Sequence, residues 1–460
     1  MDKSLFASFS SEKEESCLIA FLAITAGALL LAWPALLNGF PVVFSDTHAF
    51  LVQGGAPQMV WDKPFVFGPV LALLHLRLTL WLPLAAQVLV LSHLLWLVRG
   101  AFAVPNWRFH LALCAGLAAL SAAPWFASLL MPDILAPMVV LCLFLLSFAR
   151  LGWPVRLWLL ALGSFAIASH LSHLPLALAV GVVALLLHGR RMVLAPLGLA
   201  LAVLLATNAV GHGRFGISPY GSVFALARLA TDGPAQAVLG RECPRAEWKL
   251  CDWQGRFPDD SDLFLWKGWG PVWSTGGPMA LAPEAAAIVR ATLVQEPWAV
   301  LRTALGNFWA QLWQVRLGDT LGDDWLEGSI TGSLQAYFPA AEMARFRAGR
   351  QMQGTLRAVA EPLNPWHLAI LAAGAVVTLV LALRGQKLAV LVLVGVLANA
   401  ATSGALSGPH DRYQARIAWL VLVPVVMRKK ESSFCEQKEA KKLHPLRRGE
   451  PDAAVMLANG

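Results

Sequence analysis

Apolar residues gather in long runs along this chain, and short polar stretches separate most of the runs. Runs of this kind are typical of helices that cross a bilayer, which need about 20 apolar residues when they stand upright. Several runs are shorter, so their ends are approximate. The pattern predicts an all-α polytopic membrane protein with about ten transmembrane helices. The ten runs cover residues 17–39, 78–98, 109–123, 134–149, 157–171, 174–188, 192–210, 365–383, 388–406 and 413–427.

The runs divide the chain into five parts. A polar start, 1–16, without a helical apolar period precedes an N-terminal transmembrane module of about seven helices over 17–210. The one large hydrophilic segment is 211–364, and a module of about three helices follows over 365–427. Residues 428–460 form a basic tail.

Composition excludes an ordinary soluble domain. Hydrophobic residues make up 57% of the chain, charged residues only 14%, and the mean hydropathy is +0.60. Such values are typical of membrane proteins. The first run is long and lacks a small-residue cleavage site, so we expect it to be an uncleaved first span.

The distribution of charge predicts an orientation. With a cytoplasmic N-terminus, half of the 36 basic residues fall on the inner segments, and nearly all of these segments are short. This bias is the positive-inside rule. It predicts a multi-pass protein of the bacterial inner membrane with both termini cytoplasmic. The net charge of +8 then suits contact with anionic membrane lipids, and nothing indicates nucleic acid.

Eight charged residues remain once the inner segments and the hydrophilic segment are set aside. All of them lie at or near the outer ends of predicted spans. Charges needed only for solubility have no reason to share one side. The eight are Asp46, Asp62, Lys63, Arg77, Asp133, Asp411, Arg412 and Arg416.

The first outer loop, 40–77, carries the most suggestive of these charges. Asp46 lies beside His48 where the first span ends, and a carboxylate this close to hydrocarbon is a functional candidate. The alternative is that Asp46 caps a short interfacial helix that begins at Thr47. Asp133 has the same two interpretations, because it follows a proline and opens an apolar helix.

Histidines also face the predicted outer side. His170 and His173 join two spans, and His410 precedes Asp411 between the last two. Two imidazoles alone favour satisfied polar groups over a metal site, which needs more ligands. We predict that the outer histidines, with Asp411, support the site or bind the acceptor.

Two features of the hydrophilic segment could be taken for metal-binding sites but have simpler interpretations. Cys243 and Cys251 are eight positions apart, which favours a small-loop disulfide on the outer side. The acidic run 259–262 lacks the alternating spacing of a calcium loop, so we expect a solvated turn.

An amphipathic helix is predicted at 284–316. Its apolar residues recur with helical spacing, and polar residues lie between them. Such a helix is expected to lie at the membrane interface. A crossing helix would put the basic tail outside, against the charge bias. The apolar positions are Leu293, Trp298, Leu301, Leu305, Trp309 and Trp313.

The outer charges suit a transfer reaction on a lipid-linked substrate. Asp46 or Asp133 could act as general base toward an acceptor hydroxyl or amine. Cationic side chains could hold a phosphate leaving group. Phosphate-binding loops, nucleophile elbows and zinc-protease patterns are absent from the sequence, which disfavours nucleotide-driven and hydrolase chemistry. The sequence indicates no cofactor, and it leaves open whether the reaction uses a divalent cation. The predicted phosphate-binding residues are Lys63, Arg77, Arg412 and Arg416.

The first 210 residues resemble the GT-C superfamily of membrane glycosyltransferases in order and topology. The resemblance lies in Asp46 early in the first loop, in the Lys-Pro…Gly-Pro segment 63–69, and in Pro132-Asp133 at the position of the second acidic residue. It implies an inverting transferase that moves a sugar from a polyprenyl-phosphate donor to an extracytoplasmic glycolipid, polysaccharide or protein acceptor.

On this resemblance Asp46 would be the base, Asp133 would bind acceptor or metal, and the amphipathic region would cover the substrate. Two departures stand out. Thr47 takes the place of the second adjacent acid that many members carry, which puts a metal-dependent variant in doubt. The large soluble C-terminal domain of some members has no counterpart.

Two other function classes compete. A lipid or solute transporter usually places ionisable groups near the membrane midplane, often in repeated halves. This chain has its charges at the outer ends and no repeat. In a non-catalytic assembly subunit, the outer charges would form a docking surface.

Overall fold

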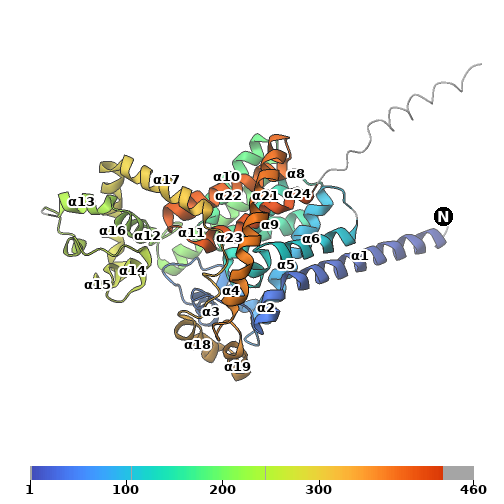
Figure 1. Cartoon of the computed structure of the whole chain (residues 1–460), viewed down its shortest axis with the longest axis horizontal. Helices are drawn as coiled ribbons and strands as arrows, with labels where there is room; N and C mark the ends of the chain where they lie inside the picture. The colour runs from blue at the N-terminus through green and yellow to red at the C-terminus, as the bar shows by residue number, and fades with distance from the viewer. Residues whose placement is uncertain (1–2, 105, 244, 428–460) are drawn as a thin grey trace, which may run out of the picture.

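We describe a computed structural model, in which residues 3–104, 106–243 and 245–427 are described (Figure 1). These residues fold into helices, joined by loops with one isolated bridge between Val42 and Leu129. The predicted all-α class is therefore confirmed. Residues 428–460, predicted as a basic tail, lie outside the described part.

Seven helices form the N-terminal bundle around a central helix. The centre is α8, in which every residue from Leu135 to Ser147 is buried. Helices α5, α9, α10 and α22 contact it on all sides. The seven helices are α1 (Lys3–Leu31), α5 (Trp81–Ala101), α6 (Trp107–Leu120), α8 (Leu135–Phe148), α9 (Trp153–Ala168), α10 (His173–Leu186) and α11 (Ala195–His212).

Within the described ranges, four helical stretches are long and apolar enough to cross a membrane, as expected of a polytopic membrane protein. They are Trp81–Ala101, Arg191–His212, Leu356–Leu383 and Lys387–Leu406. Shorter apolar helices occupy most of the other predicted spans. The total of ten transmembrane helices stays a prediction. These shorter helices are Cys17–Leu31, Trp107–Leu120, Pro132–Phe148, Trp153–Ala168 and His173–Leu186, together with Gly221–Thr231, which was not predicted as a span.

The first and last predicted spans differ from single helices. Helix α1 already begins at Lys3, inside the predicted polar start, and ends at Leu31; α2 (Trp33–Asn38) follows, with Pro34 in its first turn. The last run divides into α23 (Asp411–Ala418), a 3₁₀ turn and α24 (Leu422–Val426). Pro34 explains the first break and Pro424, in α24, the second, because proline lacks an N–H and its ring clashes with the preceding helical turn.

The hydrophilic segment forms two structures rather than one. Its first part is a lobe with its own core, to which Val223, Phe264 and Ile288 contribute, on the left in Figure 1. Cys243 and Cys251 form a disulfide there, as their spacing predicts. The lobe consists of α12 (Gly221–Thr231), α13 (Pro234–Glu242), α14 (Ser261–Trp266), α15 (Pro271–Ser274) and α16 (Pro278–Gln295).

The second part packs on the bundle. Leu326, Ile330 and Phe346 join the main core, and α18 contacts α3 (Thr47–Gly55) in the first loop. Figure 1 shows α18 and α19 beside α3 and α4 at the bottom of the molecule. The helices of this part are α18 (Leu326–Tyr337), α19 (Ala340–Ala348) and α20 (Leu356–Ala360).

The remaining helices connect these parts. They are α4 (Phe67–His75), α7 (Ala123–Ser128), α17 (Pro297–Trp313), α21 (Asn364–Leu383) and α22 (Lys387–Leu406), and short 3₁₀ turns at Pro132–Ile134, Arg191–Leu194, Lys249–Trp253, Glu361–Leu363 and Trp419–Val421.

The predicted amphipathic helix is broken in two at Glu296, where Pro297 starts α17. Helix α17 lies along α22 and turns its polar side inward: Gln311 is buried. Its apolar side chains face outward, which is the opposite of a soluble helix and suits contact with lipid. The exposed residues are Trp298, Leu301, Leu305, Trp309 and Trp313.

Candidate functional site

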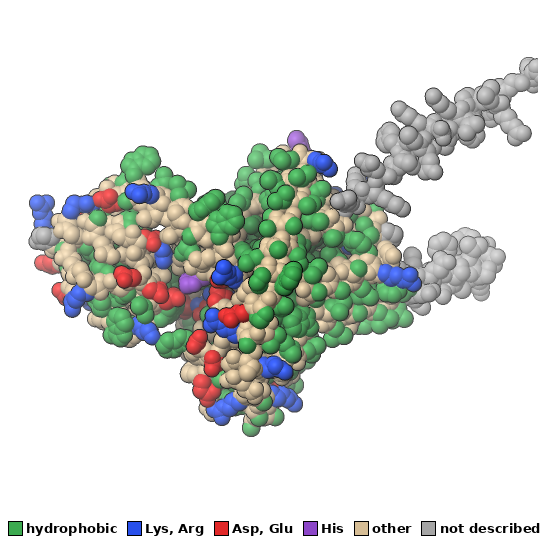
Figure 2. Space-filling model, viewed as in Figure 1, with side chains coloured by type: hydrophobic (Ala, Val, Ile, Leu, Met, Phe, Trp, Pro, Cys, Tyr) green, Lys and Arg blue, Asp and Glu red, His purple; other side chains and the backbone are tan. Residues whose placement is uncertain are grey.

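Two acidic residues that are 87 positions apart in the chain lie on either side of one arginine. Arg412 Nη2 is 3.8 Å from Asp46 Oδ2, and Arg412 Nε is 3.7 Å from Asp133 Oδ1. Arg416 Nη1 approaches the same Asp133 oxygen at 3.4 Å. We use the name ionic cluster for Asp46, Asp62, Lys63, Asp133, Arg412 and Arg416. Figure 2 shows basic and acidic side chains gathered where the lobe meets the bundle.

A short extended pairing brings the two acids together. The Val42 N–H donates to the Ser128 carbonyl at 3.0 Å, and the Leu130 N–H donates to the Val42 carbonyl at 2.9 Å. The amide of Gln351 then holds Val43 through both backbone groups. The first loop is thereby aligned with the segment that leads into Asp133, which places Asp46 beside it.

Asp46 does not cap α3, although the helix begins at Thr47 as predicted. It occupies the N-cap position, but its side chain makes no capping hydrogen bond. The carboxylate is 28% exposed and lies 3.3 Å from Lys63 Nζ. Burial alone would raise the pKa of Asp46, but the charges of Lys63 and Arg412 lower it below the ordinary value. Asp46 is therefore an ionised carboxylate that solvent can reach.

Lys63 lies between two carboxylates. Its Nζ is 2.5 Å from Asp62 and 3.3 Å from Asp46. The side chain of Gln53 donates to the carbonyls of Lys63 and Pro64, which fixes this part of the loop. Burial would lower the pKa of Lys63, but the two acids together raise it, so its ammonium stays charged.

Asp133 is buried, with 2% of its surface exposed. It lies in the first turn of a 3₁₀ helix whose N-cap is Met131, and no side chain caps this turn. Its role is to pair with Arg412 and Arg416, not to cap a helix. Arg416 is held further by Ser172 Oγ and Asn399 Oδ1, both at 3.0 Å.

Arg412 is fixed from several sides. Its backbone N–H donates to Asp319 Oδ2 at 2.7 Å, and its guanidinium lies over the ring of Phe44, 4.4 Å from the centroid. Among the described residues, Arg412 Nη1 and Arg416 Nε have no hydrogen-bond partner although both atoms are buried. Buried donors of this kind are costly unless an acceptor joins them, so these two N–H groups are candidates to bind the oxygen atoms of an anion.

The predicted histidines lie near the cluster in different settings. His173 Nδ1 donates to the Ala166 carbonyl, and His170 Nδ1 shares a hydrogen bond with Ser172, the residue that also holds Arg416. His48 Nδ1 shares a hydrogen bond with Ser333, and burial lowers the pKa of His48. His410 bonds through its backbone, and its ring packs on Tyr413.

Two predicted site residues have other partners. Arg77 Nη2 donates to the Gly55 carbonyl at 2.7 Å, and its guanidinium lies over Tyr337. Arg77 thus binds residues outside the ionic cluster. The sequence predicted its depth at the outer end of a span, but not which of the other helices it would lie beside. Asp411 accepts from the backbone N–H of Arg316 and so positions a loop.

Several residues of the site carry little or no signal in the sequence. Asp319 is one of 15 acids in the hydrophilic segment, and Gln311 and Asn399 are neutral amides within helices. Their contribution is a hydrogen bond to a residue remote in sequence, which no local pattern reveals. The polar side of the amphipathic helix is the only hint of Gln311.

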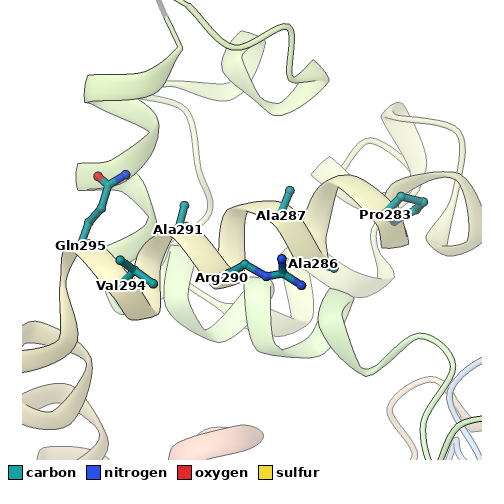
Figure 3. A pocket seen from close by; sticks show the side chains of 7 residues that line it. All are labelled: Pro283, Ala286, Ala287, Arg290, Ala291, Val294 and Gln295. Atoms are coloured by element: carbon teal, nitrogen blue, oxygen red, sulfur yellow. The ribbon is translucent and has the colours of Figure 1, made fainter.

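A hollow on α16 lies apart from the ionic cluster, and the described residues contain no metal site. Within the part of the chain that the structure describes, no group of three or more His, Cys, Asp or Glu residues could hold a metal ion. A shallow hollow on α16 is lined by Pro283, Ala286, Ala287, Arg290, Ala291, Val294 and Gln295 (Figure 3). It contains no residue of the ionic cluster.

Comparisons with known proteins give no information about the function of this chain. No protein-family model, no curated protein and no solved structure matches this chain. The geometry of the ionic cluster therefore carries the functional argument.

Proposed function

We propose that this protein is a GT-C-like glycosyltransferase that moves a sugar from a polyprenyl-phosphate donor to an extracytoplasmic acceptor. One observation carries the proposal: a solvent-accessible, ionised Asp46 lies beside Lys63 and Arg412, and Arg412 is itself held by a buried Asp133. A base and two cations within one cluster match what displacement of a phosphate leaving group needs.

Asp46 is the general base. The acceptor oxygen or nitrogen attacks the anomeric carbon, its proton passes to the Asp46 carboxylate, and the bond from that carbon to the phosphate oxygen breaks. The polyprenyl phosphate leaves with the bonding electron pair. Attack from the face opposite the phosphate inverts the configuration at this carbon.

Lys63 and Arg412 hold the phosphate and offset the charge that grows on it as the bond breaks. Arg412 Nη1 and Arg416 Nε supply N–H groups that no described residue accepts. A phosphate oxygen is a suitable acceptor for them. Asp133 is a positioning residue that aligns the two arginines rather than a ligand of acceptor or metal.

Binding of the donor also activates the base. The ionic cluster contains three acids and three bases, so it is balanced without substrate. A phosphodiester adds a negative charge and competes with Asp46 for Lys63 and Arg412. The pKa of Asp46 then rises from its lowered value, which makes it a better base when the donor is present.

The predicted topology puts this site on the outer side of the bacterial inner membrane. Lipid access is favoured by α17, whose exposed face carries Trp298, Leu305 and Trp309. Helix α17 also contacts His410, the N-cap residue of α23, which carries Arg412. A donor anchored in the membrane would approach from this side.

The test is a transfer assay with purified protein in proteoliposomes. Prenyl phosphates that carry radiolabelled glucose, galactose, mannose or arabinose are supplied, with membrane extract as the acceptor source. We expect release of sugar-free prenyl phosphate together with label on a new product. Label that crosses the bilayer on an intact donor would indicate a transporter, and neither result would indicate an assembly subunit.

A further inference from the structure

Three aromatic side chains pack together beside the ionic cluster. Trp61 of the first loop stacks on Phe224 of α12, with ring centroids 5.0 Å apart and planes inclined by 22°. Trp266, at the end of α14, lies 5.3 Å from Trp61 and 6.2 Å from Phe224. The lobe and the first loop therefore meet through these rings.

Trp266 connects this aromatic group to the charged site. Lys63 Nζ lies 5.8 Å from the Trp266 ring centroid and 3.3 Å from Asp46 Oδ1. The Trp266 side chain is nevertheless 42% exposed. An indole held in place by two other rings, next to the proposed base, is thus partly open to a ligand.

A second exposed tryptophan comes from a different segment. Lys267, the next residue, places Nζ 4.2 Å from the ring centroid of Trp325, which is 71% exposed. Trp325 has a φ of 67° at the start of α18. A large side chain in this left-handed region is strained, and such strain is often found at functional sites.

The chemistry of this surface matches a sugar ring. The face of an indole carries partial negative charge and attracts the weakly positive C–H groups on the less polar face of a pyranose. The ammonium groups of Lys63 and Lys267 can donate to sugar hydroxyls. A hydrocarbon chain would gain from the rings but would displace water from the Lys267 ammonium without offering it an acceptor.

We propose that Trp266, supported by Trp61 and Phe224, is the platform on which a sugar ring stacks during transfer. The inference rests on the proposed function, because Lys63 links the platform to Asp46. The ring could belong to the donor or to a glycan acceptor, and both sources offer the same C–H face and hydroxyls.

A binding experiment on the full chain in lipid nanodiscs tests the platform. The probes are prenyl phosphates of ten carbons that carry glucose, galactose, mannose or arabinose, the same prenyl phosphate without sugar, and the soluble disaccharides maltose and lactose. We expect Trp266→Ala to weaken a sugar-bearing probe about tenfold, the scale of one stacked ring. The sugar-free prenyl phosphate should bind as before, and Trp266→Phe should retain part of the affinity.

Trp269→Ala is the matched control, because Trp269 is an exposed tryptophan three residues away, in the turn that follows α14. A loss confined to prenyl-linked sugars assigns the platform to the donor, and a loss confined to disaccharides assigns it to the acceptor. Equal loss with the sugar-free probe, no loss with any probe, or no preference of the wild-type protein for sugar would overturn the proposal. Because binding is measured without turnover, the platform can hold even if transfer is not observed.

Discussion

The side-chain amide of Gln311 bonds to both backbone groups of His410. Its Nε2 donates to the His410 carbonyl at 2.7 Å, and its Oε1 accepts from the His410 N–H at 3.1 Å. Gln311 is fully buried on α17, and Arg412 follows two residues after His410. The helix with the exposed apolar face thus fixes the N-cap residue of α23, the helix that carries the central arginine of the ionic cluster.

Gln311→Ala is expected to loosen Arg412 and weaken its hold on the donor phosphate. Two buried hydrogen bonds are lost, so the KM for a lipid-linked donor should rise about five- to tenfold. Steady-state kinetics with the labelled donor checks this result. Gln314→Ala, at the end of the same helix, is the control, and equal kinetics for both variants would contradict the positioning role.

Asp133→Asn is expected to destabilise the fold. The change leaves the buried guanidinium groups of Arg412 and Arg416 without their shared counter-charge, and breaking a buried ion pair costs about 3–5 kcal/mol. Asp46→Asn should cost less than about 1 kcal/mol, because its carboxylate is partly exposed. Thermal denaturation in detergent compares the two variants. A stable Asp133→Asn protein would show that Asp133 does not hold the arginines.

The pH dependence of transfer should separate the free enzyme from the donor complex. The pKa of Asp46 lies below its ordinary value of 3.8 in the free protein. The acidic limb of kcat/KM, which reports the free enzyme, should therefore lie below that value. The donor phosphate competes for Lys63 and Arg412, so the acidic limb of kcat should lie at higher pH. Coinciding limbs would exclude activation of the base by the donor.

The lowered pKa of Asp46 in the free protein also affects the stability of the fold. A carboxylate with a lowered folded-state pKa stabilises the fold above its unfolded pKa, and this contribution is lost as the pH falls through the folded value. The melting temperature of the wild-type protein should thus fall more than that of Asp46→Asn when the pH is taken below about 4.

The disulfide between Cys243 and Cys251 should stabilise the lobe alone. A cross-link over so short a loop is worth about 2 kcal/mol. Cys243→Ser is therefore expected to increase proteolysis within residues 211–296 without changing proteolysis of the bundle. Limited proteolysis followed by mass spectrometry measures both. Cys17→Ser, which changes a free exposed cysteine, is the control.

The sequence predicted the helical class, because apolar runs are a local property, and six of the eight charges that it selected at the ends of spans meet in the ionic cluster. It did not predict the breaks near Pro34 and Pro424, since a run can be apolar throughout and still not be one helix. It grouped Arg77 with Lys63 and Arg412, because the end of a span gives depth but not lateral position. Gln311 and Asp319 act only through contacts with residues far along the chain.

Replacement of the proposed base tests the central claim most directly. Release of sugar-free prenyl phosphate from the labelled donor is measured for wild-type protein, for Asp46→Asn and for Asp232→Asn, which alters another ion-paired carboxylate outside the ionic cluster. General-base catalysis contributes about 10²–10⁴-fold, so Asp46→Asn should lose at least about a hundredfold in rate while it folds normally. Asp232→Asn should stay near wild type. An Asp46→Asn protein that releases prenyl phosphate at the wild-type rate would contradict the account.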